Sequence, residues 1–292
     1  MRHIWKLEEK TGNLKWIFIL LLAAGIFSSG LAQQLTSTNA QAVVLYNEGL
    51  ILADQEKFNE ALTKLRQAID LDPNFIQAHL RYMDAFRSVG RGSEVAVMYK
   101  NMLGQHPSSA LYHFLYGRAL DALADKRAEF KKALELDSTY YWAQFGIGGT
   151  YMLESRYDEA IVALNKALEM KPDGIDALTL LATIYIDKGM PYQARSLLEQ
   201  ALALDSLNPG LYMKLGQVYS QLEKYQTAEK AFRKAAALKP DEPVIYYYIG
   251  LACELGQEND GAVENYEKFV QIAPDHELAP AAKKNIERLK KK

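Results

Sequence analysis

The amino-acid sequence predicts an all-α solenoid built from antiparallel helix pairs. The first observation is a recurring stretch, which reads ALNKALEMKPD at residues 163–173 and AFRKAAALKPD at residues 231–241. The second is its period, because a proline or serine follows each stretch about every 34 residues, at Pro73, Pro107, Ser138, Pro172, Ser206, Pro240 and Pro274. A period of this length, kept over seven units, indicates a repeat architecture.

Each unit is predicted to fold as two helices joined by a short turn. In the unit at 175–208, apolar residues recur at helical spacing over 176–190 and again over 192–205, and Gly189 and Pro191 mark the turn between them. Small residues recur at two positions where paired helices must approach closely, and large apolar residues recur around them. The predicted units are residues 42–75, 76–109, 110–140, 141–174, 175–208, 209–242 and 243–276.

Two units depart from this pattern. The second has Met83 and Val95 at positions that hold small residues elsewhere, and it has His79 at a position that holds tyrosine in the units at 209–242 and 243–276. The third unit is three residues short near its turn, around ALADKRAEF. We therefore expect a shortened turn or helix in the third unit.

The first 41 residues differ in composition from the repeats. Four basic residues at positions 2, 6, 10 and 15 precede an apolar run from Trp16 to Phe27, and the small residues Gly30 and Ala32 follow it. This order predicts a secretory signal over residues 1–32 and a polar linker over 33–41. The uncharged stretch 16–32 is slightly shorter than the roughly 20 residues of a membrane span, so an uncleaved signal anchor stays open, as does a buried cytosolic helix.

The last segment, residues 277–292, has apolar residues at helical spacing and ends in lysines. We expect it to form a helix that caps the last repeat, since a solenoid needs a polar outer face at its end. The alternative is a basic tail that binds anionic lipid or another polyanion.

The repeats resemble the tetratricopeptide repeat (TPR). The unit at 209–242 matches that family's pattern at Tyr212, Leu215, Gly216, Tyr219, Ala228, Phe232, Ala235 and Pro240, and the resemblance covers residues 42–276. It implies a right-handed superhelix in which the first helix of each pair lines a concave face. It also implies a scaffold that binds a protein or peptide partner.

The positions that face this concave surface in the resembled family are mostly apolar here. The expected partner-binding residues are Tyr46, Leu80, Asp84, Phe114, Arg118, Trp142, Phe145, Met152, Met213, Gln217 and Tyr247. Phe114, Trp142, Phe145 and Met152 are the expected main anchor, because aromatic side chains in a concave site make strong contacts. The alternative is that some of these residues pack between helices. The Lys and Asn residues with which related proteins grip a chaperone's C-terminal carboxylate are missing from the corresponding positions, so we exclude that function.

Several classes of function are excluded by composition or by the lack of a motif. The formal net charge of −2 gives no basic footprint for nucleic acid. No phosphate-binding loop, zinc-protease motif or nucleophile elbow occurs, so we expect no catalytic residue, no metal and no cofactor. His79 and His113 share one repeat position but have no further ligands around them in the sequence, and Cys253 lies in an apolar helical pattern.

The expected function is that of a non-enzymatic scaffold or adaptor of the cell envelope or periplasm. It would bind a peptide or domain in an apolar, aromatic groove and touch the membrane only through residues 16–32, if these are not cleaved. The alternative is a membrane-anchored accessory subunit of an envelope enzyme or transport complex. Self-association stays open.

Overall fold

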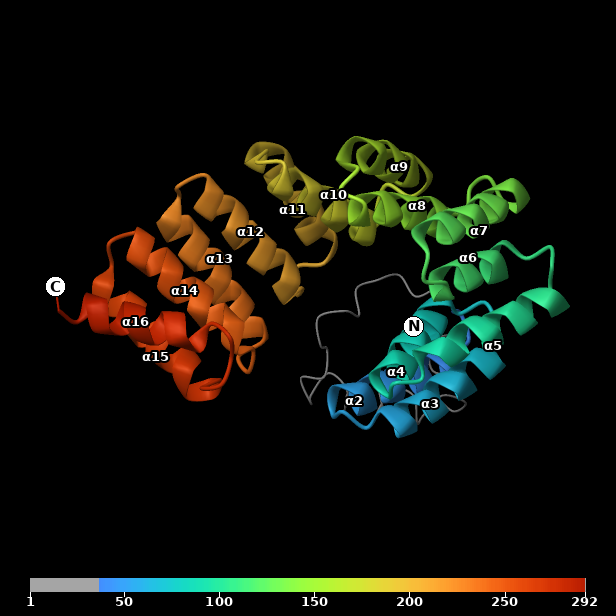
Figure 1. The fold of residues 1–292 in the computed structure, drawn as a ribbon, viewed down its shortest axis with the longest axis horizontal. Helices are drawn as coiled ribbons and strands as arrows, with labels where there is room; N and C mark the ends of the chain where they lie inside the picture. The colour runs from blue at the N-terminus through green and yellow to red at the C-terminus, as the bar shows by residue number, and fades with distance from the viewer. Residues whose placement is uncertain (1–36, 292) are drawn as a thin grey trace, which may run out of the picture. The chain divides into compact units, whose positions relative to one another are not determined.

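The computed structural model describes residues 37–291, and all regular structure within them is α-helical (Figure 1). The helices are α2 (Ala40–Asp54), α3 (Phe58–Leu71), α4 (Ile76–Ser88), α5 (Gly92–Gln105), α6 (Ala110–Ala119), α7 (Leu123–Leu136), α8 (Tyr141–Leu153), α9 (Tyr157–Met170), α10 (Ile175–Asp187), α11 (Pro191–Leu204), α12 (Pro209–Gln221), α13 (Tyr225–Leu238), α14 (Pro243–Leu255), α15 (Asn259–Ile272) and α16 (Ala279–Leu289). The predicted class, an all-α solenoid of helix pairs, is confirmed. The predicted signal or anchor at residues 1–32 lies outside the described part of the chain.

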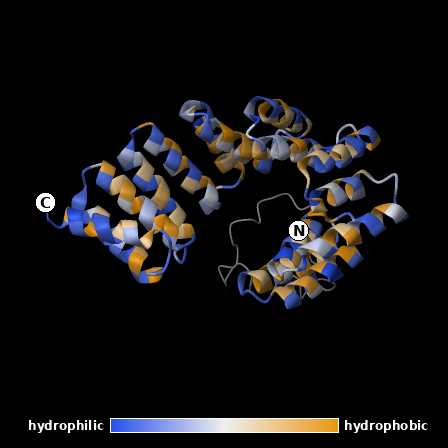
Figure 2. Cartoon of the chain, viewed as in Figure 1, coloured by the Kyte–Doolittle hydropathy of each residue, from blue (hydrophilic) through white to orange (hydrophobic). Residues whose placement is uncertain are grey.

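The chain divides into two compact units. The first comprises residues 34–201 and contains α2 to α10 with most of α11, and the second contains residues 202–291 with α12 to α16. Within each unit most helices pack against the helices before and after them in the chain, as α8 does against α7 and α9. Figure 2 shows hydrophobic and hydrophilic residues interspersed along these helices, as amphipathic packing requires.

The turn inside a regular pair is closed by backbone hydrogen bonds. At the end of α8, the Arg156 amide donates to the carbonyl of Tyr151 at 2.9 Å, and the Ser155 amide donates to that of Met152 at 2.9 Å. This is the Schellman arrangement, which needs a left-handed residue just after the helix. Six turns have one, with φ between 57° and 75°, at Glu56, Gly90, Ser155, Gly189, Glu223 and Gln257.

The third pair lacks this turn. Helix α6 has 10 residues where α8 has 13, and Leu120 and Ala122 are extended where the other pairs have a left-handed residue. The three missing residues therefore shorten both the first helix and the turn of this pair, as expected from the sequence.

Close helix approach depends on a glycine in the first helix of a pair. A Cβ built on Gly216 would lie 2.4 Å from the ring of Phe232, and one built on Gly148 would lie 2.7 Å from Leu164. In the second pair the same position holds Met83, which is fully buried and faces a helix carrying the buried Val95. Helices α4 and α5 accordingly approach each other less closely than the partners in the neighbouring pairs.

The C-terminal helix α16 packs against α15 and buries Ala279, Ala282 and Leu289. Arg288 of α16 and Lys290 at its C-cap form ion pairs with the preceding repeat, Arg288 with Glu254 and Lys290 with Glu267. The helix thus covers the last pair, as expected of a cap. None of the described helices is both long enough and apolar enough to span a membrane.

Candidate functional site

The residues predicted to bind a partner differ in their exposure. Tyr46 and Phe114 are only 3% and 1% exposed and belong to the hydrophobic core of the first unit. The ring of Tyr46 lies 4.9 Å from that of Phe75, and the ring of Phe114 lies 5.5 Å from that of Phe130. These two side chains pack between helices, so the expectation that they anchor a partner does not hold for this structure.

Helix α8 carries the apolar surface. Trp142, Phe145 and Met152 are half-buried, and Leu153 is 72% exposed. With Gly149 they fall within about a third of the helix circumference, since successive residues turn by roughly 100°. We call this group of five residues the α8 face. Leu153 was missed among the sequence predictions, although its spacing of eight residues from Phe145 places it on the same face.

The core fixes the aromatic residues of the α8 face. The indole of Trp142 lies 6.4 Å from the ring of Phe114 and 6.2 Å from that of Phe145, the latter at 85°. Edge-to-face pairs of this kind are favoured by the ring quadrupoles. The phenol of Tyr141 also accepts a hydrogen bond from the Ala177 amide at 3.3 Å, which ties α8 to α10. The buried Phe114 therefore supports the surface on which Trp142 and Phe145 are partly exposed.

Gly149 contributes no side chain to the middle of the α8 face. A Cβ placed there would meet only a methyl group of Leu180, at 3.9 Å, which is an ordinary contact distance. The half-buried backbone of α8 at Gly149 thus lies between the larger side chains of Phe145 and Met152.

The predicted polar residues Asp84 and Arg118 lie on α4 and α6 of the same unit. Leu80 lies on α4 with Asp84 and is half-buried. Asp84 accepts a hydrogen bond from Arg87 at 3.2 Å and lies 3.8 Å from Arg81. The Nε atom of Arg118 is buried and has no hydrogen-bond partner within residues 37–291.

The remaining predicted residues belong to the second unit. Met213 and Gln217 on α12 and Tyr247 on α14 are half-buried. The ring of Tyr247 lies 5.5 Å from those of Tyr266 and Phe269, so much of it packs within its own unit. These three residues are not members of the α8 face.

His79 and His113 occupy equivalent positions and bind equivalent carbonyls. The Nε2 atom of His79 lies 3.0 Å from the Pro73 carbonyl, and that of His113 lies 3.1 Å from the Pro107 carbonyl. Tyr246 occupies the same position in the last pair and donates to the Pro240 carbonyl at 2.8 Å. The two histidines therefore replace an aromatic residue that fastens each pair to the linker before it.

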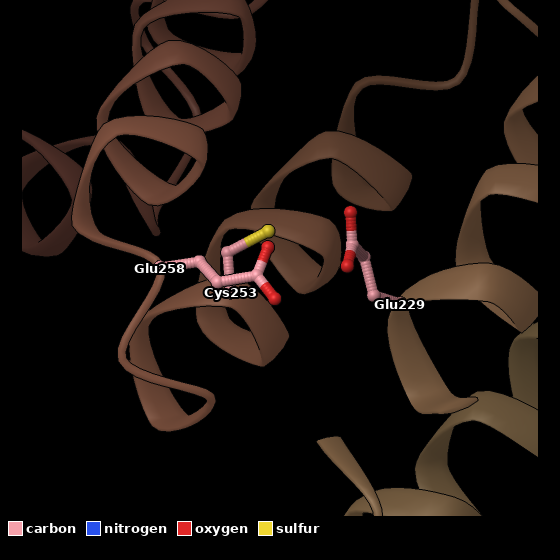
Figure 3. A group of neighbouring side chains, drawn as sticks. All are labelled: Glu229, Cys253 and Glu258. Carbon is pink, nitrogen blue, oxygen red and sulfur yellow. The ribbon is translucent and has the colours of Figure 1, made fainter. Parts of the chain in front are cut away.

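One group of possible metal ligands occurs among the described residues. Glu229 on α13, Cys253 on α14 and Glu258 before α15 place their ligand atoms within 4.8 Å of one another (Figure 3). Arg233 already pairs with Glu229 at 2.6 Å. Burial, followed by the neighbouring Glu229, raises the pKa of the Cys253 thiol to about 11, so the thiol is protonated at neutral pH. We assign this group to packing and ion pairing.

Comparison with known sequences identifies the repeat. Sequence families described as "TPR repeat" and "Tetratricopeptide repeat" match residues 49–81 and 213–277, and one described as "Anaphase-promoting complex, cyclosome, subunit 3" matches residues 154–235. The chain is a tetratricopeptide-repeat protein. The TPR matches fall in both compact units.

Similar full-length proteins are distant. Anaphase-promoting complex subunit 6 from Arabidopsis thaliana is 22% identical over 247 residues, which cover 81% of this chain and 39% of that protein. The mitochondrial import receptor subunit TOM70 from Homo sapiens is 25% identical over 250 residues, which cover 84% of this chain and 36% of that protein. This chain thus spans less than half the length of either relative. A human protein O-mannosyl-transferase, TMTC1, is 26% identical over 46% of this chain and 16% of its own length.

Solved structures share the fold. YrrB, described as a TPR protein with an unusual peptide-binding site, aligns with a TM-score of 0.53 at 25% identity and covers 64% of this chain and 97% of its own. MamA from Desulfovibrio magneticus RS-1 aligns with a TM-score of 0.52 at 17% identity, over 62% of this chain and 97% of its own. The second likeness is one of fold alone.

Proposed function

We propose that this TPR protein is a non-enzymatic adaptor of the cell envelope that binds an apolar segment of a protein partner on the α8 face. The observation that carries the proposal is the exposure of Leu153 next to the half-buried Trp142 and Phe145. A leucine that is 72% exposed contributes little to folding. Apolar side chains gathered on one rigid element are typical of a binding surface.

Two further points support a peptide as the partner. TPR proteins present the first helix of each pair to their partners, and α8 is a first helix. YrrB, which is 25% identical to this chain, has a peptide-binding site. The placement in the cell envelope depends on the basic and apolar pattern of residues 1–32 alone.

The binding surface can be tested with a displayed library of random peptides selected on the purified full chain. We expect the selected peptides to carry large apolar side chains, and we expect Leu153→Lys to weaken their binding about tenfold or more, because it places a charge on the α8 face. Fluorescence anisotropy with a labelled peptide measures the change. Phe145→Ala should act in the same direction.

The control for that experiment is Val162→Lys, which changes an equally apolar, 57% exposed residue on the second helix of the same pair. This variant should bind the selected peptides as the unaltered chain does. Equal losses in Leu153→Lys and Val162→Lys, or a library that yields no apolar binder, would contradict the proposed surface.

A further inference from the structure

Helix α2 is the first described helix of the repeat array (Figure 1). Later first helices pack against the second helix of the preceding pair, as α4 does against α3, α8 against α7 and α14 against α13. Within residues 37–291 no pair precedes α2, which packs against α3 and, less extensively, against α4. One side of α2 therefore lacks the neighbour that the other first helices have.

The later repeats show which residues belong to that side. The third and tenth residues of a unit lie on the far side of the first helix from the small residue that touches the second helix, so they face the preceding pair. Both positions are buried in α4, α8, α10 and α14, at Ala78 and Ala85, Ala143 and Thr150, Ala177 and Ile184, and Ile245 and Ala252. Their counterparts in α2 are Val44 and Ile51, which are only half-buried.

Val44 and Ile51 are apolar without contributing to the core. Val43, Leu45 and Leu50 of α2 pack against the core of the first unit, whereas Val44 and Ile51 are not among the described residues that do so. Both are β-branched, so they are not favoured by helix propensity either. Two apolar side chains seven residues apart form a stripe along α2 that a further helix could cover.

The other end of the array has a polar face. Helix α16 takes the place of a following first helix on α15, and its residues Lys283, Lys284 and Glu287 are exposed. A solenoid end that meets only water needs a polar face of this kind. The α2 end carries Val44 and Ile51 instead, which is typical of an end that another chain covers.

A pair of opposite charges lies beside the apolar stripe. Glu48 is four residues after Val44 and three before Ile51, so all three lie on one side of α2. Its carboxylate pairs with the ammonium of Lys64 on α3 at 2.7 Å, and the two side chains are 45% and 38% exposed. We call Val44, Glu48, Ile51 and Lys64 the α2 end face. Because it holds one negative and one positive group between apolar residues, this face is complementary to its own image after a two-fold rotation.

We propose that the α2 end face pairs with the same face of a second copy of this chain in a two-fold dimer. In an antiparallel pair of α2 helices, Val44 of one copy would contact Ile51 of the other, and Glu48 would face the other copy's Lys64. A second copy fits better than an unrelated helix, because both the apolar stripe and the charge pair match themselves.

The expected dimer is weak. One 15-residue helix from each copy makes an interface below the roughly 1,200–2,000 Å² of stable complexes, so we expect a micromolar dissociation constant. The α8 face lies on a different helix, so the dimer does not depend on the proposed function. It would present two α8 faces, which would strengthen binding to a partner that repeats its apolar segment.

Sedimentation velocity tests the dimer. The full chain and the expected exported product, which begins at Gln33, are each measured from low micromolar to submillimolar concentration. We expect the exported product to pass from monomer to dimer as the concentration rises. Val44→Glu should weaken the dimer about tenfold or more, because the interface would bury a charge without a partner. Val97→Glu is the matched control, since Val97 on α5 is 62% exposed, and it should leave the dimer unchanged.

A charge exchange separates the interface from a structural role of the ion pair within one chain. Glu48→Lys gives each copy two positive groups on the α2 end face, and Lys64→Glu gives each copy two negative groups. Each variant alone should form the dimer about tenfold more weakly, because like charges would face each other. An equimolar mixture of the two variants should recover the dimer, whereas mixing cannot restore an ion pair that is lost within a chain.

The outcomes decide the proposal. A monomer at every concentration in both preparations would overturn it, and so would a dimer that Val44→Glu and Val97→Glu weaken equally. A mixture of the charge variants that stays monomeric would overturn the two-fold pairing. A dimer formed by the exported product but not by the full chain would support the α2 end face and identify residues 1–32 as a competitor for it. Circular dichroism verifies that each variant folds.

Discussion

His79 and His113 occupy the same repeat position in adjacent pairs, yet the Nδ1 atoms of their rings contact different partners. The ring of His79 lies between a carbonyl, which needs a donor at Nε2, and the Tyr99 hydroxyl, which can donate to Nδ1 at 2.9 Å. His113 lies between the Pro107 carbonyl and the Glu129 carboxylate, at 2.7 Å from Nδ1, so both partners are acceptors. A neutral ring completes the hydrogen bonds of His79.

The carboxylate of Glu129 reflects this pairing. Burial would raise its pKa, but hydrogen bonds from Lys132 and His113 lower it overall. Glu129 therefore stays ionised in a site that is only 8% exposed. The pair joins α6 to α7 in the repeat that lacks a regular turn.

Stability towards acid should depend on His79. Burial lowers its pKa from 6.5 to about 4, so the unfolded chain takes up the proton first as the pH falls. The contribution of the neutral ring is complete above pH 6.5 and is lost between 6.5 and about 4, a difference of at most about 3 kcal/mol. Urea unfolding at about pH 7 and about pH 5 should show a smaller acid loss in His79→Gln than in the unaltered chain.

His106→Gln is the control for this prediction, since His106 is exposed. Protonation of carboxylates contributes to the acid loss in every variant, so the comparison isolates the histidine. An equal acid loss in His79→Gln and His106→Gln would show that His79 is not the acid-sensitive group.

At the scale of an element, the spacing of each helix pair is set by one small side chain. The glycine at this position lies against the large residue of the second helix, as Gly216 does against Phe232 and Gly250 does against Tyr266. In the second pair Met83 stands at this position instead of glycine. Helices α4 and α5 are therefore farther apart, and the Met83 side chain fills the space between them. Size complementarity at this contact therefore decides how a pair packs.

Gly216→Ala should lower the free energy of unfolding by about 1–3 kcal/mol, because the Phe232 ring would have to move. The intrinsic helix preference of alanine offsets part of this, by roughly 1 kcal/mol. Gly104→Ala is the matched control, because nothing lies within 4 Å of a Cβ at Gly104 in α5. That variant should be neutral or more stable. Urea denaturation compares the two, and a stabilised Gly216→Ala would refute the close contact.

At the scale of the whole molecule, the two compact units carry different parts of the predicted surface. The α8 face and the end of α6 lie in residues 34–201, whereas α12 to α16 offer mainly packed tyrosines and a C-terminal cap. A partner segment bound at the α8 face would thus engage the first unit. The α8 face occupies only one helix of the repeat array.

Export is the prediction that concerns the whole chain. We expect expression of the full chain with a C-terminal tag in a bacterial host to give a soluble envelope product that begins at Gln33, because the small residues Gly30 and Ala32 suit a signal peptidase. Its formal charge would be −4, since residues 1–32 remove four basic and two acidic residues from a chain with 34 Lys+Arg and 36 Asp+Glu. Mass spectrometry and N-terminal sequencing measure the product.

Other products would redirect the search for a partner. An intact chain in the membrane fraction would favour an anchored accessory subunit of an envelope complex. An intact soluble chain in the cytoplasm would contradict export.

The repeat architecture was determined by local sequence alone. Prolines and serines at a fixed period, small residues at helix contacts and apolar residues at helical spacing act within one unit or between neighbours, so each can be recognised without coordinates. The shortening of the third pair was predictable for the same reason, because a deletion of three residues is visible in the spacing.

The functional surface depended on the tertiary structure. The repeat pattern predicted both Phe114 and Trp142 as anchors, but packing buries the ring of Phe114 and leaves that of Trp142 half-exposed. Whether an inward-facing residue is core or surface depends on the neighbouring pair, which no periodic pattern specifies. Likewise, Arg87 and Lys126 lie 39 residues apart in the chain, yet both donate hydrogen bonds to the Arg118 carbonyl. They meet because a short helix and a missing turn bring three helix ends together, and only the folded chain contains that contact.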